Sequence, residues 1–185
     1  MEIPRFPIIL GLGANLPGRF GPPRAALGAA LARLEAAGVA LTGRSPWYES
    51  APVPMSDQPW YVNGVVTVTT ELDPAALLAL LLATEAEMGR ERSVQNAARV
   101  IDLDLLACGE IVRKPPEAVP ELPHPRLAAR AFVVLPLFDL LPGWRHPETG
   151  TAVADMARAL PAGQQIRVLA DAGGPYGTEL QDSGR

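Results

Sequence analysis

Residues 61–74 are Tyr61-Val62-Asn63-Gly64-Val65-Val66-Thr67-Val68-Thr69-Thr70-Glu71-Leu72-Asp73-Pro74, and this stretch predicts a strand that leads directly into a helix. The Val and Thr residues favour an extended backbone, because branched side chains pack well on a pleated sheet. Asp73 can cap a helix, and Pro74 suits the first helical turn because no N–H donor is needed there. The expected buried stripe of the helix is Leu77, Leu78, Leu81 and Leu82, and Gly89 is expected to end it.

Outward from this unit, the sequence predicts the order strand, helix, strand, strand, helix, strand. The other elements are strands over 7–12, 39–48 and 100–106, and a helix that begins at Pro23 and ends by Gly38. This order is a split βαβ arrangement, so we expect an α+β fold with a mostly antiparallel sheet and helices packed on it. Three later elements are expected: a short apolar helix or turn over 132–141, a helix over 152–160 and a strand over 166–170.

The length and composition limit the class of protein. The 185 residues fit one domain, which we expect over 1–170, followed by a flexible, Gly-rich tail over 171–185. With 16 basic and 20 acidic residues the net charge is -4, which argues against a nucleic-acid or anionic-membrane binder. One cysteine and two histidines allow no internal disulfide and no credible structural zinc site. No apolar run reaches the roughly 18 residues that a membrane-spanning helix needs, so we expect a cytoplasmic protein.

The stretch Ile101-Asp102-Leu103-Asp104-Leu105 carries the strongest chemical signal. Side chains alternate in a strand, so Asp102 and Asp104 share one face with backbone positions roughly 6.5–7 Å apart. Two such carboxylates repel each other unless a cation lies between them, and oxygen ligands of this kind suit Mg²⁺. The other interpretation is the solvent face of an amphipathic strand, but aspartate is disfavoured in strands.

Arginines surround the two aspartates in the sequence. Arg90, Arg92 and Arg99 precede the strand, and His124, Arg126 and Arg130 follow it. Acidic metal ligands flanked by arginines suit a polyphosphate substrate, because guanidinium groups bind phosphate oxygens well. The alternative is a solvated loop with ordinary surface arginines.

Two common nucleotide motifs are absent. There is no glycine-rich loop that ends in Gly-Lys-Ser/Thr, and Lys114 is the single lysine, so the chain is not a P-loop NTPase. The run Gly11-Leu12-Gly13-Ala14-Asn15-Leu16 has Leu16 where a dinucleotide fingerprint needs its third glycine.

Tyr61 and Asn63 lie two residues apart and therefore share a face of their strand. An aromatic ring beside an amide suits a flat heterocycle with a hydrogen-bonding edge. The same pair also fits a core aromatic and a satisfied amide, and His124, between Pro123 and Pro125, also fits either a structural or a functional role.

Taken together, these motifs resemble the 6-hydroxymethyl-7,8-dihydropterin pyrophosphokinase family of folate biosynthesis. The resemblance covers about Ile8 to Pro147. It rests on seven short segments. They are Leu-Gly-Ala-Asn-Leu at 12–16, Tyr-Glu-Ser at 48–50, Asp-Gln-Pro-Trp-Tyr-Val-Asn at 57–63, Gly-Arg-Glu-Arg at 89–92, Arg-Val-Ile-Asp-Leu-Asp-Leu-Leu at 99–106, Leu-Pro-His-Pro-Arg-Leu at 122–127 and Arg-Ala-Phe-Val-Val-Leu-Pro-Leu at 130–137. The resemblance implies a ferredoxin-like core in a three-layer αβα sandwich.

The resemblance also implies a reaction, transfer of pyrophosphate from ATP to the hydroxymethyl group of the pterin with release of AMP. Asp102 and Asp104 would hold two Mg²⁺ ions, and one of them, or its metal, would help to deprotonate the attacking hydroxyl. Arg90 and Arg99 would offset charge on the transferred group. The family positions that contact ATP correspond to Glu85, Arg92, His124 and Arg130, together with the two aspartates.

For the pterin, the resemblance implies that Tyr61 and Phe132 sandwich the ring. Asn63 and the backbone near Ser50 and Val53 would recognise its edge, and Gln58 would lie near the substrates. The implied partners are these small molecules, with no nucleic acid and no membrane, and the protein is expected to be a monomer.

The chain departs from the family where many members have Trp-Gly-Pro before the arginine of the metal strand. This chain has Asn96-Ala97-Ala98 there, so the aromatic residue that often covers the pterin is missing. The alternative function is therefore a pterin- or nucleotide-binding relative without catalysis. The joint presence of Asp102, Asp104, Arg90, Arg99 and His124 favours the enzyme.

Overall fold

One antiparallel sheet organises the protein. The structure is a computed structural model that describes residues 7–90, 98–116 and 119–179. Strand β1 (Ile8–Ala14) lies at the centre, between β4 (Tyr61–Thr69) and β5 (Asp102–Cys108). Strand β3 (Tyr48–Ser50) follows β4, and β6 (Ile166–Val168) follows β3, which gives the order β5-β1-β4-β3-β6. Strand β2 (Ala40–Arg44) also pairs with β4.

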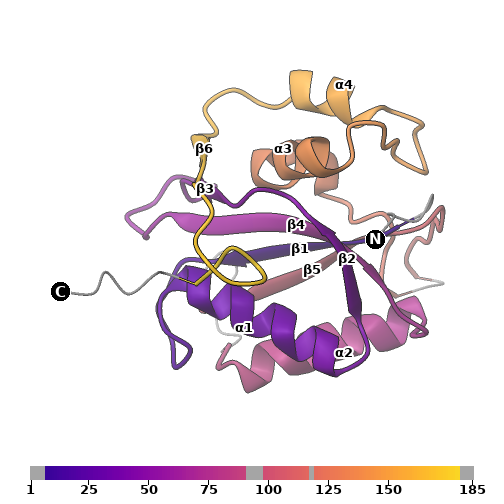
Figure 1. Ribbon diagram of the computed structural model, residues 1–185. Coiled ribbons are helices and arrows are strands. Elements are labelled where there is room, and N and C mark those ends of the chain that lie inside the picture. Colours follow the sequence, from indigo (N-terminus) through magenta and orange to yellow (C-terminus); the bar gives the residue numbers. More distant parts are fainter. Residues whose placement is uncertain (1–6, 91–97, 117–118, 180–185) are drawn as a thin grey trace.

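Helices cover both faces of this sheet (Figure 1). The helices α1 (Pro23–Ala36) and α2 (Pro74–Glu87) pack on one face, and α3 (Ala131–Leu140) and α4 (Val153–Arg158) lie on the other. A short 3-10 turn, η1 (Leu127–Ala129), precedes α3. The predicted α+β class with an antiparallel sheet is therefore confirmed. The elements through β5 follow the expected order, except that three strands, β2, β3 and β4, lie between α1 and α2 where two were expected.

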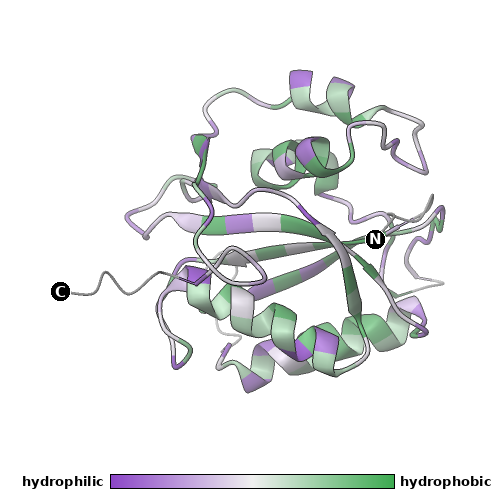
Figure 2. Cartoon of the chain, viewed as in Figure 1, coloured by the Kyte–Doolittle hydropathy of each residue, from purple (hydrophilic) through white to green (hydrophobic). Residues whose placement is uncertain are grey.

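The alternation of side chains along the central strands separates two cores. Leu10 and Leu12 of β1 pack with Leu27 of α1 and Leu77 of α2, whereas Ile9 packs with residues of α3 and α4. Asp73 caps α2 as expected, because its carboxylate accepts the Ala76 N–H at 2.9 Å. Figure 2 shows hydrophilic residues within β5, between hydrophobic ones.

The sequence interpretation was wrong in predicting one strand over 39–48, because the structure has two short strands, β2 and β3, on either side of residues 45–47. Pro46 has no N–H for a sheet ladder. Trp47 is completely buried, and a Cβ atom on Gly64 would come within 2.6 Å of its ring. Between β2 and β3 the chain therefore leaves the sheet, and the indole ring of Trp47 packs over Gly64 of β4.

The C-terminal segment lies along the same edge. β6 pairs with β3, Tyr176 O accepts the Trp47 Nε1–H at 2.9 Å, and Gly177 O accepts Arg24 Nε–H at 3.1 Å. The flexibility expected for 171–185 stays a prediction, but its residues 171–179 make these contacts with the body of the fold, and 180–185 lie outside the described residues. Within the described ranges, no helix has both the length and the apolar character that crossing a membrane requires.

Candidate active site

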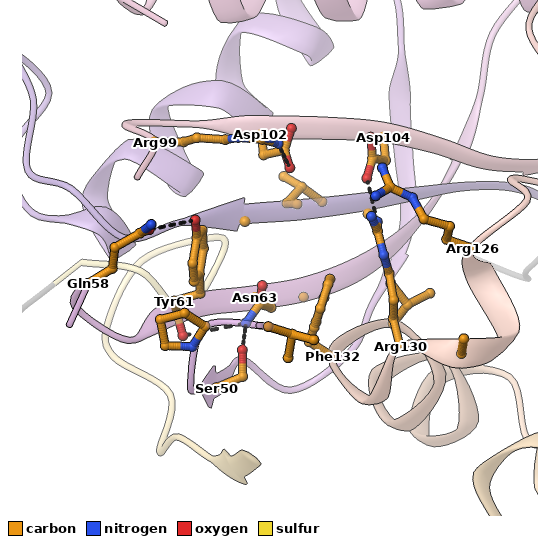
Figure 3. A pocket seen from close by; sticks show the side chains of 18 of the residues that line it. Ser50, Gln58, Tyr61, Asn63, Arg99, Asp102, Asp104, Arg126, Arg130 and Phe132 are labelled. Carbon is orange, nitrogen blue, oxygen red and sulfur yellow. Dashed lines mark hydrogen bonds and ion pairs between the residues drawn. The ribbon is translucent and has the colours of Figure 1, made fainter. Parts of the chain in front are cut away.

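A cavity of about 620 Å³ lies between the sheet and α3 (Figure 3). This volume is within the range of pockets that bind small molecules. Strands β1, β3, β4 and β5 contribute to its walls, together with the loop after β3 and the start of α3. The predicted site residues that line it are Ser50, Val53, Gln58, Tyr61, Asn63, Arg99, Asp102, Asp104, Arg130 and Phe132.

Two glycines of β1 form the floor of this cavity. Gly13 pairs with Asp102 of β5 on one side and with Asn63 of β4 on the other, and Gly11 pairs with Asp104. A Cβ atom on Gly13 would come within 3.1 Å of Asn63 Oδ1. The absence of side chains on β1 therefore leaves open space between the carboxylates and the amide. Both glycines belong to a strand that is antiparallel to both of its neighbours, so they do not form the turn of a parallel βαβ dinucleotide-binding unit.

The two aspartates of β5 meet arginines from three different segments. Asp102 accepts hydrogen bonds from Arg90 Nη1 at 2.7 Å and from Arg99 Nη1 at 2.6 Å. Arg130 Nη1 lies 3.5 Å from Asp104 Oδ2. The predicted convergence of arginines on the aspartate pair is thus present, and Arg92 lies outside the described residues.

The aspartates also influence each other. Burial raises the pKa of Asp104, and the neighbouring charge of Asp102 raises it further, against the opposing effects of His124 and Arg130. Burial lowers the pKa of His124, which Asp104 partly offsets. A bound cation would relieve the repulsion between the carboxylates.

His124 lies beside the carboxylates but does not line the cavity. Its backbone N–H donates to Leu106 O at 2.8 Å, and its ring Nδ1 accepts the Arg126 N–H at 3.1 Å. These bonds hold the turn between prolines 123 and 125 against the outer edge of β5. Arg126, which the sequence analysis placed among the flanking arginines without assigning it a role, lines the cavity.

Glu85 and Arg90 contact β5 but do not line the cavity. Glu85 is only 1% exposed, accepts the Leu103 N–H at 2.6 Å and forms an ion pair with Arg90. Burial raises the pKa of Glu85, whereas the Leu103 hydrogen bond and Arg90 lower it. Because Leu103 lies between the two aspartates, Glu85 fixes the backbone that carries them. Its predicted contact with ATP stays a prediction.

The opposite wall carries the residues predicted for the pterin. Asn63 is buried and donates from Nδ2 to Ser50 Oγ at 2.7 Å, and in Figure 3 it lies between Tyr61 and Phe132. Burial raises the pKa of Tyr61, whose hydroxyl lies 3.4 Å from Gln58 Oε1. The arrangement provides two rings beside an amide, as a flat heterocycle requires.

Asn15 is a residue whose role the sequence did not reveal. It is 2% exposed, and its Nδ2 donates to Pro59 O at 2.9 Å while its Oδ1 accepts the Arg99 N–H at 2.8 Å. Asn15 therefore joins the loop before β4 to the loop before β5, one on each side of the cavity. A polar residue directly after a buried strand was the signal that could have indicated it.

Comparison with known proteins agrees with this geometry. Residues 9–142 match the family model described as 7,8-dihydro-6-hydroxymethylpterin-pyrophosphokinase (HPPK). The chain is 39% identical to 2-amino-4-hydroxy-6-hydroxymethyldihydropteridine pyrophosphokinase of Pseudomonas aeruginosa, over 83% of this chain and 91% of that protein. It is 36% identical to the protein of the same name from Synechocystis, over 80% of this chain and 73% of the relative.

Among solved structures, the chain is similar to Plasmodium falciparum HPPK-DHPS with pteroate, with a TM-score of 0.65 and 14% identity. This match covers 86% of the chain and 45% of the Plasmodium chain, so the chain spans less than half the length of that relative. At this identity the similarity concerns the fold.

Proposed function

The chain belongs to the 7,8-dihydro-6-hydroxymethylpterin-pyrophosphokinase family, and we propose that it uses ATP and two Mg²⁺ ions for its reaction. That reaction is pyrophosphoryl transfer to 6-hydroxymethyl-7,8-dihydropterin in folate biosynthesis. ATP would supply the β- and γ-phosphates as one group and leave as AMP. The observation that carries the proposal is the placement of Asp102 and Asp104 across a glycine floor from Tyr61 and Asn63.

The donor set fits Mg²⁺. Among the described residues, no group of three or more His, Cys, Asp or Glu side chains could hold a metal by itself. Mg²⁺ is usually bound through one or two carboxylates and completes its shell with water and substrate phosphates, so Asp102 and Asp104 are a sufficient protein contribution. When bound, Mg²⁺ would offset the negative charge of the phosphate oxygens.

The arginines would position the phosphates and the carboxylates. Arg99 and Arg130 line the cavity and already contact Asp102 and Asp104, so each can move between a carboxylate and a phosphate oxygen over a short distance. Arg90, which does not line the cavity, would hold the Asp102 carboxylate in place. The pterin hydroxyl would lose its proton toward one of the aspartates, or to a base that their metal supplies, and its oxygen would attack the β-phosphorus.

The pterin would bind between Tyr61 and Phe132. The Asn63 amide, fixed by Ser50, can both donate and accept a hydrogen bond at the ring edge. The loop that contains Val53 closes the same side of the cavity. His124 and Arg126 would lie near the phosphates, since the charge of His124 acts on Asp104 and Arg126 lines the same cavity.

A cytoplasmic monomer is part of the proposal. A single cysteine suits a reducing compartment, and the substrates are small molecules that one cavity can accommodate. Light scattering during gel filtration tests the oligomeric state directly.

The deciding experiment incubates the protein with ATP, Mg²⁺ and 6-hydroxymethyl-7,8-dihydropterin and separates AMP from ADP. Pterin-dependent AMP together with a pyrophosphorylated pterin is the expected result. ADP as the product would contradict two-phosphate transfer. Saturable pterin binding without turnover would favour the non-catalytic relative instead.

A further inference from the structure

Two segments that are distant in the sequence form facing walls of the cavity. One wall is the end of β3 with the loop after it, which includes Ser50 and Val53. The other is the turn before α3 with the first residues of that helix, which includes Arg130 and Phe132. The separation of these walls determines how a ring and a phosphate chain fit between them.

A third segment, residues 164–168, contacts both walls. Strand β6 pairs with β3, with Ile166 opposite Ser50, and Gln165 O accepts the Ala51 N–H at 2.9 Å. Gln164 is bonded to the other wall through its side chain. Its Oε1 accepts the Ala131 N–H at 2.9 Å, and its Nε2 donates to Ala129 O at 3.0 Å.

The start of α3 explains why such a bond is needed. The first N–H groups of a helix lack intrahelical partners and usually bond to a Ser, Thr, Asp or Asn side chain at the N-cap. Here the N-cap is Arg130, whose side chain makes no capping bond. Its guanidinium instead lies 3.5 Å from Asp104 Oδ2 and 5.4 Å from the centre of the Phe132 ring. Gln164 supplies the acceptor that Arg130 does not provide.

Open space borders this junction. A second cavity of about 240 Å³, lined in part by Gln164, shares Pro52, Val53 and Ala129 with the main one. α3 packs on the sheet through Val133, Val134 and Leu137, and at this open point the two bonds of Gln164 connect the walls.

We infer that Gln164 is a positioning residue, which caps α3 from the β6 segment and thereby sets Arg130 and Phe132 against the β3 wall. This inference rests on the function proposed above. Gln164 does not line the main cavity, so it acts through these two residues and not through contact with substrate.

The test compares Gln164→Ala, Gln164→Glu and Gln165→Ala with the wild-type chain. Gln165 is a matched control, since it is the adjacent glutamine and its bond to Ala51 uses only the backbone. Loss of the cap in Gln164→Ala should raise the KM for the pterin about tenfold, with kcat changed less than about threefold. Gln164→Glu should give a KM between those of Gln164→Ala and the wild type, because a carboxylate still accepts the Ala131 N–H but cannot donate to Ala129 O.

Hydrogen exchange at the Ala131 amide gives a second measurement that does not depend on turnover. Exchange should be faster in Gln164→Ala and unchanged in Gln165→Ala. An unchanged pterin KM in an active Gln164→Ala variant, or an equal effect in Gln165→Ala, would overturn the inference. A wild-type chain without turnover would contradict the proposed function instead, and the exchange rates would then decide whether Gln164 holds the wall.

Discussion

The two carboxylate oxygens of Asp102 are bound by two different arginines, Arg90 at 2.7 Å from Oδ1 and Arg99 at 2.6 Å from Oδ2. Arg90 follows α2, whereas Arg99 lies in the loop that leads into β5. The orientation of Asp102 is therefore set before a substrate arrives. The two arginines nevertheless differ in their access to it, because only Arg99 lines the cavity.

Arg99→Ala should lower kcat by about 10²–10³-fold, because it removes a cation from the proposed phosphate site. The Kd for the pterin, measured by fluorescence titration, should change little. Arg158→Ala is the control, since Arg158 pairs with Asp155 on the exposed surface of α4. An unchanged kcat in Arg99→Ala would contradict its charge-stabilising role.

Asp102→Ala and Asp104→Ala should each lower turnover by about 10³-fold or more, because each removes a proposed metal ligand. Circular dichroism should show an intact fold, since both side chains point into the cavity and not into the core. Asp155→Ala controls for the loss of a carboxylate elsewhere. Full activity in either cavity variant would rule out the metal assignment.

Asn63→Ala should raise the pterin KM at least about tenfold, because the hydrogen-bonding groups at the edge of the pterin ring would lose their proposed partner. Ser50→Ala should have a smaller effect in the same direction, since it removes only the group that orients the amide. Steady-state kinetics with varied pterin at saturating ATP measures both. Equal KM values for Asn63→Ala and the wild type would exclude Asn63 from pterin recognition.

Gly13→Ala tests the floor of the cavity. The added methyl group lies 3.1 Å from Asn63 Oδ1, so the amide must shift, and we expect a pterin KM about tenfold higher. Gly143→Ala is matched, because its Cβ would have no heavy atom within 4 Å. If the two variants behave alike, the floor does not define the pterin site.

The stability of the protein should fall on mild acidification through His146. Burial lowers the pKa of His146, so the folded state binds its proton less readily than the unfolded state does. The contribution of neutral His146 to the free energy of unfolding is fully present above the pKa of the unfolded state, near 6.5. It is lost as the pH falls through the lower pKa of the folded state. Urea denaturation at pH 7.5 and pH 5 should show a smaller loss of unfolding free energy in His146→Gln than in the wild type. An equal pH dependence would exclude His146 as the source.

Periodic patterns revealed much of this molecule. The alternation in β4 and β5 places Asp102, Asp104, Tyr61 and Asn63 on one face, and the structure brings all four to one cavity. Such a pattern is predictable because burial of one strand face fixes the direction of every side chain. The cap of α2 by Asp73 is equally local.

Features that depend on distant segments were not predictable. The break between β2 and β3 arises because Trp47 packs over Gly64, a contact that no local pattern records. Asn15 bonds to the Arg99 backbone, 84 residues further along the chain, and Gln164 caps a helix 33 residues before it. Each is an ordinary polar residue in sequence, and only the tertiary arrangement gives it a role.

The position of β6 also determines when the cavity can be completed during synthesis. Trp47 bonds to Tyr176, which follows it by 129 residues, and the β3 wall pairs with residues 166–168. A nascent chain that has emerged only as far as α4 contains every residue proposed for catalysis, yet it lacks the strand that borders Ser50 and the cap of α3. Assembly of the site during synthesis is therefore expected to follow formation of the α1–α2 face of the sheet.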